Sequence, residues 1–392
     1  MKAKLIRITT VPLSLRVLLK GQHRFMSEHF EVIGVSSPGK ELADVEKDEE
    51  VEVIAIDMSR KITPIKDVIS LWNTYKFLKR EKPQIVHTHT PKAGIVGMLA
   101  ANLAGVPHRL HTVAGLPLVE SAGVKRKVLE FVEKLTYASA NMVYPNSKGL
   151  YDYILEHNYT DKYKLKVIGN GSSNGIDTLF FSPDQVSEVQ KELLRKELNI
   201  KDEDFVFVFV GRLVGDKGIN ELVKAFSLLN KTKNAENQFK LLLVGSLEQE
   251  LDPLPEDVLS QIKNNPDIID IGFQKDVRPY FAISDVLVFP SYREGFPNVV
   301  MQAGAMGLPS IVSDINGCNE IIMEGQNGVL VPVKNTEKLS HAMERMKSDT
   351  AYYQKLKMNA RSMIQSRYEQ SEVWNALLGE YKKLIKEKEY RV

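Results

Sequence analysis

Two cations stand five positions apart in a glycine-rich stretch, Gly211-Arg212-Leu-Val-Gly-Asp-Lys217-Gly. The apolar run 205–210 before it has the length and composition of a buried strand, and a helical pattern follows it. Unpaired N–H groups at a helix N-terminus attract phosphate, and Arg and Lys donate charge-assisted hydrogen bonds to phosphate oxygens. Arg212 and Lys217 are therefore candidates for binding a diphosphate, although most such cations are solvated surface residues.

A carboxylate occupies a similar junction in Glu294-Gly-Phe-Pro-Asn-Val299. The apolar run 286–289 before it predicts a buried parallel strand, which Pro290 ends because proline has no N–H to donate. Pro297 fits the first turn of a helix that runs to about Gly307. Open α/β sheets bind ligands where strands end and helices begin, so Glu294 is a second candidate binding residue. The alternative is a carboxylate that only caps the helix.

Histidines occur at two predicted strand ends in the first half of the chain. His111 ends the run 108–112 and precedes a glycine-containing turn, where histidine has a structural role more often than a catalytic one. His87 and His89 alternate along another strand end without Asp, Glu or Cys close in sequence, so we expect no metal site there.

The elements that must position these residues alternate between short apolar strands and longer helical patterns, which predicts parallel, doubly wound α/β sheets. Strands are expected at 5–8, 31–35, 51–56, 84–87, 108–112, 142–144 and 166–168, and helices at about 14–27, 64–81, 92–104, 124–139 and 147–157. A second series of strands is expected at 205–210 and near 239–244, 267–271, 286–289, 309–312 and 328–331, with the last helices at about 350–388. The acidic segment 41–50 is predicted to be a loop. The segment 169–175, rich in Gly and Asn, is predicted to be a domain-joining hinge.

The Glu294 motif and the Gly-Arg-Leu-x3-Lys-Gly loop some eighty residues before it resemble the donor site of family 4 glycosyltransferases. These are retaining, nucleotide-sugar-dependent enzymes of the GT-B fold, and the resemblance covers nearly the whole chain. It implies two Rossmann-like doubly wound parallel-sheet domains that face each other across a cleft. The acceptor-side domain would span 1–178 and the nucleotide-sugar domain 179–368, with a C-terminal helix, 369–392, crossing back to the first domain.

The resemblance also assigns roles to residues. Glu294 would lie by the donor sugar, and Gln302 would bind the ribose hydroxyls where the family has a second glutamate. That departure should weaken donor binding by roughly 1 kcal/mol, because a neutral acceptor replaces a charged one. The catalytic residues would be His111, Arg212, Lys217 and Glu294, with Lys92 and Gly115 on the acceptor side. The donor-binding residues would be Gly211, Arg212, Lys217, Phe273, Gln274, Glu294, Gly295, Phe296, Pro297, Asn298, Val299 and Gln302.

Composition restricts the class of protein. The chain has 392 residues, of which 43% are apolar and 26% charged, so two globular domains are expected and disorder is not. The single cysteine, Cys318, excludes an intramolecular disulfide and suits a reducing cytoplasm. We expect no spanning helix, since no run of 18 apolar residues occurs. We expect no signal peptide, because Arg7, Pro12 and Arg16 interrupt any apolar N-terminal core.

Charge is divided unequally along the chain. Residues 1–180 carry 25 Lys and Arg against 19 Asp and Glu, whereas residues 181–392 carry 27 against 31. A basic first half without nucleic-acid-binding motifs favours an anionic surface over nucleic acid as a partner. Lys125, Arg126 and Lys127 begin an amphipathic helix and are expected to face an anionic membrane. The alternative is that its apolar stripe, which includes Val128, packs on the sheet while the cations are only solvated.

With the resemblance, these observations imply a transferase that works without cofactor or metal. Its donor would be a UDP-sugar, and its acceptor a lipid-linked saccharide of an envelope polysaccharide at the inner face of the cytoplasmic membrane. The enzyme would be cytoplasmic and peripherally associated with that membrane. Two alternatives stay open: a UDP-sugar epimerase, because the same fold hosts that reaction, and a non-catalytic nucleotide-sugar sensor, for which Gln302 gives some ground.

Overall fold

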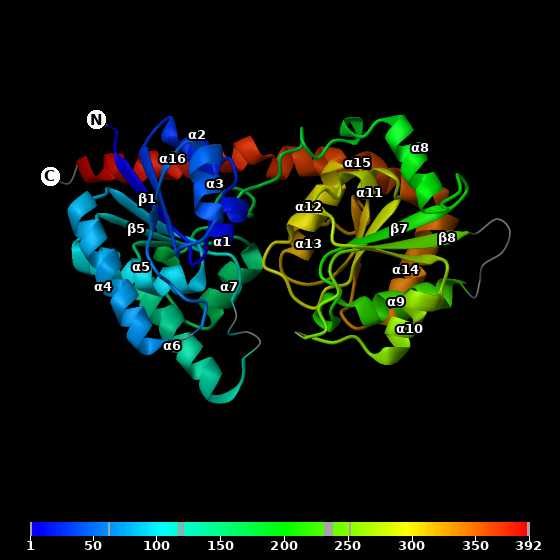
Figure 1. The fold of residues 1–392 in the computed structure, drawn as a ribbon, viewed down its shortest axis with the longest axis horizontal. Helices are drawn as coiled ribbons and strands as arrows, with labels where there is room; N and C mark the ends of the chain where they lie inside the picture. Colours follow the sequence, from blue (N-terminus) through cyan, green and yellow to red (C-terminus); the bar gives the residue numbers. More distant parts are fainter. Residues whose placement is uncertain are drawn as a thin grey trace. The chain divides into compact units, whose positions relative to one another are not determined.

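The computed structural model describes residues 2–61, 63–116, 118, 121–230, 238–250 and 252–389. The chain divides into two compact units, Met1–Gly175 with Gln370–Val392 and Ile176–Glu369. Each unit contains a six-stranded sheet with helices on both faces (Figure 1), and the paired strands are parallel. The predicted doubly wound α/β class is confirmed.

The sheet of the first unit has the strand order β3-β2-β1-β4-β5-β6. Its strands are β1 Lys4–Ile8, β2 Glu31–Ser36, β3 Glu52–Ala55, β4 Ile85–Thr88, β5 His108–Val113 and β6 Met142–Pro145. The helices are α1 Pro12–Leu18, α2 Gln22–Ser27, α3 Glu41–Glu49, α4 Pro64–Glu81, α5 Pro91–Ala104, α6 Gly123–Ser139, α7 Lys148–Glu156 and α16 Gln370–Glu389. Residues 390–392 of the predicted terminal helix lie outside the described residues.

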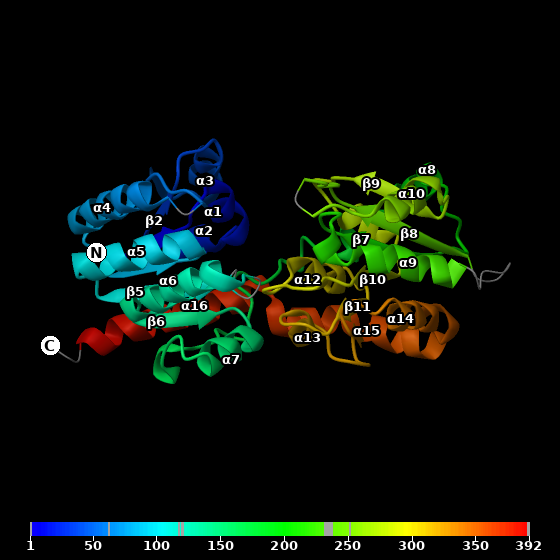
Figure 2. The same ribbon diagram turned by 90° about the horizontal axis from the view of Figure 1, so that it is seen from below.

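Two apolar layers cover the faces of this sheet. Side chains alternate along β1, so Ile6 and Ile8 enter one core and Leu5 enters another. Helices α4, α5 and α6 cover the Ile6 face (Figure 2). Helices α2 and α16 cover the Leu5 face, where Tyr381 of α16 is fully buried.

Two predictions for this unit are wrong, one of a helix and one of a loop. The expected helix 14–27 is broken into α1 and α2, because Gly21 between them has a φ of 77°. A Cβ on Gly21 would lie 2.6 Å from the Trp374 ring, so α16 also requires glycine there. The segment 41–50, predicted to be a loop, is helical over 41–49 as α3, whose Leu42, Val45 and Glu49 are buried while its other acids are at least partly exposed.

The strand expected at 166–168 does not form. Leu165 makes one isolated parallel bridge with Val143, after which the chain turns through Gly169 and Gly171. Both glycines have positive φ, 56° and 94°, and this conformation takes the backbone away from the edge of the sheet.

The sheet of the second unit has the order β12-β11-β10-β7-β8-β9. Its strands are β7 Phe205–Val210, β8 Phe239–Val244, β9 Ile268–Gly272, β10 Val286–Phe289, β11 Ser310–Ser313 and β12 Gly328–Val331. The helices are α8 Glu188–Glu197, α9 Ile219–Asn230, α10 Glu256–Asn264, α11 Arg278–Ala282, α12 Asn298–Ala305, α13 Cys318–Ile321, α14 Thr336–Ser348 and α15 Thr350–Tyr368. All six strands lie within one residue of the expected positions, because runs rich in branched and aromatic apolar residues predict strands even where one charged residue interrupts them, as in β8 and β9.

Candidate active site

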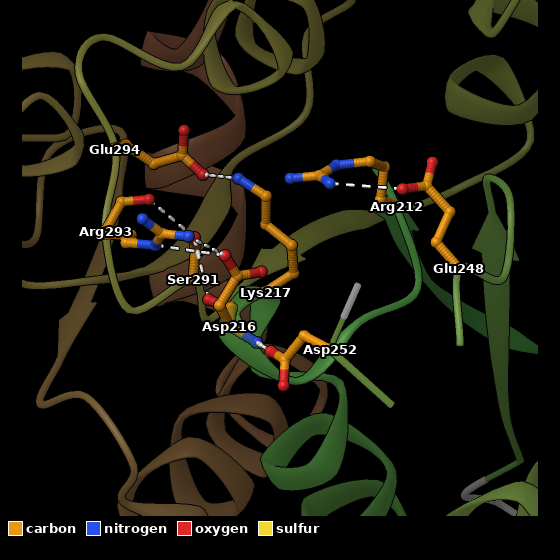
Figure 3. Close-up of polar contacts among 8 residues, drawn as sticks. All are labelled: Arg212, Asp216, Lys217, Glu248, Asp252, Ser291, Arg293 and Glu294. Atoms are coloured by element: carbon orange, nitrogen blue, oxygen red, sulfur yellow. Dashed lines mark hydrogen bonds and ion pairs between the residues drawn. The ribbon is translucent and has the colours of Figure 1, made fainter. Parts of the chain in front are cut away.

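Lys217 and Glu294 meet at the carboxyl edge of the second sheet. Lys217 ends a short 3₁₀ turn, Gly215–Lys217, between β7 and α9, and Glu294 lies between β10 and α12. Because β7 and β10 are neighbours, the two loops lie side by side. Lys217 Nζ is 2.5 Å from Glu294 Oε1, and the side chains are only 17% and 15% exposed (Figure 3). The structure thus brings together two residues that the sequence separates by 77 positions.

A glycine allows this close approach of the two loops. Gly218 has a φ of 72°, and a Cβ on it would lie 2.1 Å from the carbonyl oxygen of Pro290. Any larger residue would therefore separate the Lys217 loop from the Glu294 loop, which explains the glycine after the lysine.

A second ion pair joins the same two loops, and sequence reasoning missed it. Arg293 Nη2 lies 2.6 Å from Asp216 Oδ2, and the Asp216 backbone N–H donates to Asp252 Oδ2 at 2.6 Å (Figure 3). Ser291 Oγ donates to the Arg293 carbonyl oxygen at 3.1 Å. Asp216 and Arg293 directly precede Lys217 and Glu294, so the two ion pairs lie in the same register across the loops. This adjacency becomes a signal only once the pairing of Lys217 with Glu294 is known, and the sequence alone does not reveal that pairing.

Arg212 is also paired within its own unit. Its Nη1 lies 3.3 Å from Glu248 Oε2, and Ser246 Oγ donates to Glu248 Oε1 at 3.1 Å. Glu248 lies in the exposed loop after β8, and no sequence pattern marks it. Each cation predicted to bind a diphosphate therefore has a carboxylate partner, and the Arg212 guanidinium is the more exposed of the two.

The residues after Glu294 divide between hydrogen-bonded loop positions and packed positions. The carbonyl oxygens of Glu294 and Gly295 accept hydrogen bonds from Asn316 Nδ2 at 3.1 and 2.9 Å. Phe296 is buried and packs edge-on against Tyr368. Pro297 is the residue before α12 and not in its first turn as predicted, because the helix begins at Asn298. Val299 is partly buried in the first turn.

The other predicted donor-site residues lie on neighbouring elements. The helix α12 carries Gln302, partly exposed, and ends at Ala305 rather than near Gly307. Gly211 directly follows β7. Phe273 follows the edge strand β9 and is 74% exposed, while Gln274 Nε2 donates to the Ile271 carbonyl at 3.2 Å.

His111 lies at the carboxyl edge of the first sheet. Its Nδ1 is 2.7 Å from Thr88 Oγ1 on the adjacent strand β4. Burial lowers the pKa of His111 to about 4, so the imidazole is neutral near pH 7. A Cβ on Gly94 would lie 2.6 Å from the ring, so α5 approaches the imidazole closely. The geometry suits a neutral hydrogen-bonding group in a fixed orientation.

His87 and His89 form a buried polar layer under α16. His87 Nδ1 is 2.5 Å from Tyr381 Oη, and its Nε2 is 2.8 Å from Thr112 Oγ1. The fully buried Arg7 donates from Nε to His89 Nε2 at 3.3 Å. Burial lowers the pKa of both histidines well below the usual range, which keeps them neutral. Their contacts are those of structural residues.

The remaining predicted residues of the first unit differ in exposure. Lys92 is mostly buried and pairs with Asp67 at 2.5 Å, and its place on the acceptor side stays a prediction. A Cβ on Gly115 would meet open space. Arg126 pairs with Glu130 on its own helix at 2.8 Å.

Known proteins resemble the chain over almost all of its length. A family model described as "Glycosyl transferases group 1" matches residues 190–363, and one described as "Glycosyl transferase 4-like domain" matches residues 18–171. A capsular polysaccharide biosynthesis glycosyltransferase, CapM, from Staphylococcus aureus is 32% identical over 388 residues, covering 98% of each chain. A UDP-Gal:alpha-D-GlcNAc-diphosphoundecaprenol alpha-1,3-galactosyltransferase from Escherichia coli is 30% identical over 356 residues, covering 89% of each chain.

Solved structures share the fold. A glycosyltransferase from Rickettsia africae has a TM-score of 0.80 at 20% identity, with 98% of this chain and 99% of that chain covered. HepE from Anabaena, solved with UDP and glucose, has a TM-score of 0.81 at 17% identity, with 97% and 100% covered. From the relatives and the shared fold together, the chain belongs to the family 4 glycosyltransferases of the GT-B fold.

Proposed function

We propose that this glycosyltransferase moves a hexose or N-acetylhexosamine, with retention at the anomeric carbon, from a UDP-sugar to a lipid-linked saccharide. The product would be an intermediate of an envelope polysaccharide. The observation that carries the donor half of the proposal is the Lys217–Glu294 pair, which places a cation and a carboxylate at the ends of adjacent strands. The relatives named for capsule synthesis and for a diphosphoundecaprenol acceptor support the acceptor half.

The two cations would bind and stabilise the diphosphate. Donor binding would exchange the carboxylate partners of Lys217 and Arg212 for phosphate oxygens, and Glu294 would turn to the sugar hydroxyls. As the bond to the sugar breaks, negative charge develops on the leaving UDP. One preorganised donor to such charge is commonly worth about 2.7–4 kcal/mol. The backbone N–H groups of Phe296, Asn298 and Val299 would add to this at the start of α12.

His111 would contact the donor sugar as a neutral hydrogen-bonding group, since its pKa of about 4 leaves it uncharged. We propose that the departing phosphate accepts the proton of the acceptor hydroxyl, so that no side-chain nucleophile, cofactor or metal takes part. Turnover that is unchanged by a chelator such as EDTA would support this scheme, and restoration of activity by a divalent cation after chelation would contradict it.

We also propose that the enzyme acts at the inner face of the cytoplasmic membrane. A lipid-linked acceptor keeps its saccharide at the bilayer surface, and Lys125 and Lys127 are exposed at the start of α6. Among the described residues, no helix combines the length and apolar character that crossing a bilayer requires. We propose that attachment is peripheral and uses these exposed cations.

Incubation with a panel of UDP-sugars tests the donor half of the proposal. A glycosyltransferase should release UDP slowly by hydrolysis without acceptor and faster with a polyprenyl diphosphate saccharide. NMR of the product should show the anomeric configuration of the donor. Appearance of the epimeric UDP-sugar without free UDP would establish an epimerase instead, and tight binding of UDP-sugars without any product would establish a sensor.

A further inference from the structure

The outer face of α4 is unusually apolar for a helix exposed to solvent. Ile65, Val68, Ile69 and Trp72 follow the spacing of one helical face and are between 54% and 80% exposed. The opposite face, with Phe77 and Leu78, is buried against the unit. A surface helix normally turns polar residues outward, and a contiguous exposed apolar patch marks an interaction site.

Cations surround this apolar stripe. Lys66, Lys76 and Lys79 occupy exposed positions of α4, and within the described residues no carboxylate pairs with them. The acid nearest the stripe, Asp67, is paired with Lys92. The Lys76 ammonium lies 5.9 Å from the centre of the Trp72 ring. Trp and branched apolar residues bordered by lysines are typical of helices that lie in the interface of a bilayer.

The outer face of α6 repeats this pattern. Val124, Val128 and Phe131 are 41% to 79% exposed, and Lys125 and Lys127 lie exposed between them. The alternative that this apolar stripe packs on the sheet holds only in part, because Leu129 packs against the core while Val128 is 41% exposed. The outer face of α6 therefore carries exposed apolar residues in addition to the cations that the sequence analysis singled out.

The helices α4 and α6 lie on the same face of the sheet, and both direct their apolar outer faces away from it. They flank α5 in the helical layer that covers the Ile6 face (Figure 2), and each packs against α5. The exposed apolar residues lie in the first half of each helix, close to the carboxyl edge of the sheet. That is the edge where Thr88 and His111 are hydrogen-bonded. The surface thus adjoins the candidate acceptor side of the unit.

We propose that the outer faces of α4 and α6 form one docking surface for an anionic lipid membrane. The side chains of Ile69 and Trp72 enter the headgroup region, and the lysines bind anionic headgroups. The proposal rests on the proposed function in one respect, namely that the enzyme must reach a lipid-linked acceptor at a membrane. A second copy of the chain fits this surface less well, because a two-fold contact would bring like-charged lysines together.

Vesicle binding tests this surface. The full chain should co-sediment with vesicles of phosphatidylglycerol and phosphatidylcholine and bind pure phosphatidylcholine much more weakly, and its tryptophan emission should shift to shorter wavelength. The double substitution Ile69→Ser/Trp72→Ser should weaken binding by about tenfold, and Lys125→Ala/Lys127→Ala should weaken it at low salt. The matched control is Val189→Ser/Leu193→Ser, which removes two equally exposed apolar residues from α8.

The outcomes separate this inference from the proposed function. Calorimetric UDP binding should be the same in Ile69→Ser/Trp72→Ser as in the wild type. Loss of vesicle binding in this variant with intact UDP binding supports the surface, whether or not sugar transfer is found. Equal vesicle binding by wild type and variant overturns it. A change from dimer to monomer in the variant, without a change in vesicle binding, also overturns it and assigns the face to a protein contact.

Discussion

Lys217 is proposed to exchange its carboxylate partner, Glu294, for a phosphate oxygen of the donor. Its ammonium is held by Glu294, and the Phe289 ring lies 5.7 Å away, so the group is largely shielded from water. Shielding strengthens the interaction of the ammonium with developing negative charge. The sequence predicted both residues individually. Their pairing depends on the adjacency of β7 and β10, which the spacing along the chain does not reveal.

Replacing Lys217 by Ala should lower turnover at saturating donor by about a hundredfold or more, because one donor to the leaving diphosphate is lost. Steady-state kinetics with a UDP-sugar measures this. Lys224→Ala is the matched control, since Lys224 is half-exposed on α9 and pairs with Asp257 at 3.7 Å. Turnover of the Lys217 variant close to that of the control would remove Lys217 from the diphosphate site.

Gln302→Glu should keep or tighten UDP binding. A carboxylate accepts hydrogen bonds from ribose hydroxyls more strongly than a carboxamide does, by roughly 1 kcal/mol, which corresponds to about fivefold in Kd. Calorimetry with UDP measures the change. Abolished binding would show that Gln302 does not lie beside the ribose.

His111 should make stability depend on pH in the acidic range. Its folded pKa of about 4 lies below the usual 6.5, so its contribution is complete above pH 6.5 and is lost as pH falls toward 4. The loss should reach about 2–3 kcal/mol near pH 4.5. Urea unfolding of wild type and His111→Gln at pH 7 and 4.5 measures it, with the exposed His341→Gln as control. An equal pH dependence in all three proteins would contradict the buried, neutral imidazole.

At the scale of elements, two loops are fixed to each other by the pair Asp216–Arg293. Loop geometry of this kind could not be predicted, because Arg293 and Asp216 have no pattern of their own and become partners only through strand order. Two other elements differ from their predictions for local reasons. The many acidic residues of α3 indicated a loop, although Leu42 and Val45 have the spacing of a buried helical face. Glycine conformations ended the strand expected at 166–168.

Arg293→Met should loosen the Lys217 loop and raise KM for the donor severalfold with a smaller effect on kcat. The pair is partly exposed, so its loss should cost only about 0.5–1 kcal/mol of stability. Kinetics over a range of donor concentrations separates the two constants. Arg345→Met, which breaks the partly exposed pair between Arg345 of α14 and Asp349 directly after this helix, should change neither constant. Equal effects of the two substitutions would show that the Arg293 pair has no positioning role.

For the whole molecule, the alternation of strands and helices was sufficient to predict two parallel sheets, because short apolar runs that alternate with longer helical patterns are typical of parallel α/β sheets. The motif around Glu294 was sufficient to predict the family. The outer face of α4 was not predicted, since an apolar stripe in a sequence indicates burial unless the fold shows which side faces solvent. The sequence around Ile65 and Trp72 does not contain that information.

Transfer of a labelled sugar to a lipid acceptor tests the proposed function most directly. The protein would be incubated with each labelled UDP-sugar and a polyprenyl diphosphate saccharide, and label extracted with the lipid would be counted beside released UDP. We expect one donor to give lipid-extractable label in a one-to-one ratio with UDP, and Lys217→Ala to lower both by about a hundredfold. UDP released without label in the lipid for any donor, or equal transfer by the Lys217 variant, would contradict the proposed enzyme.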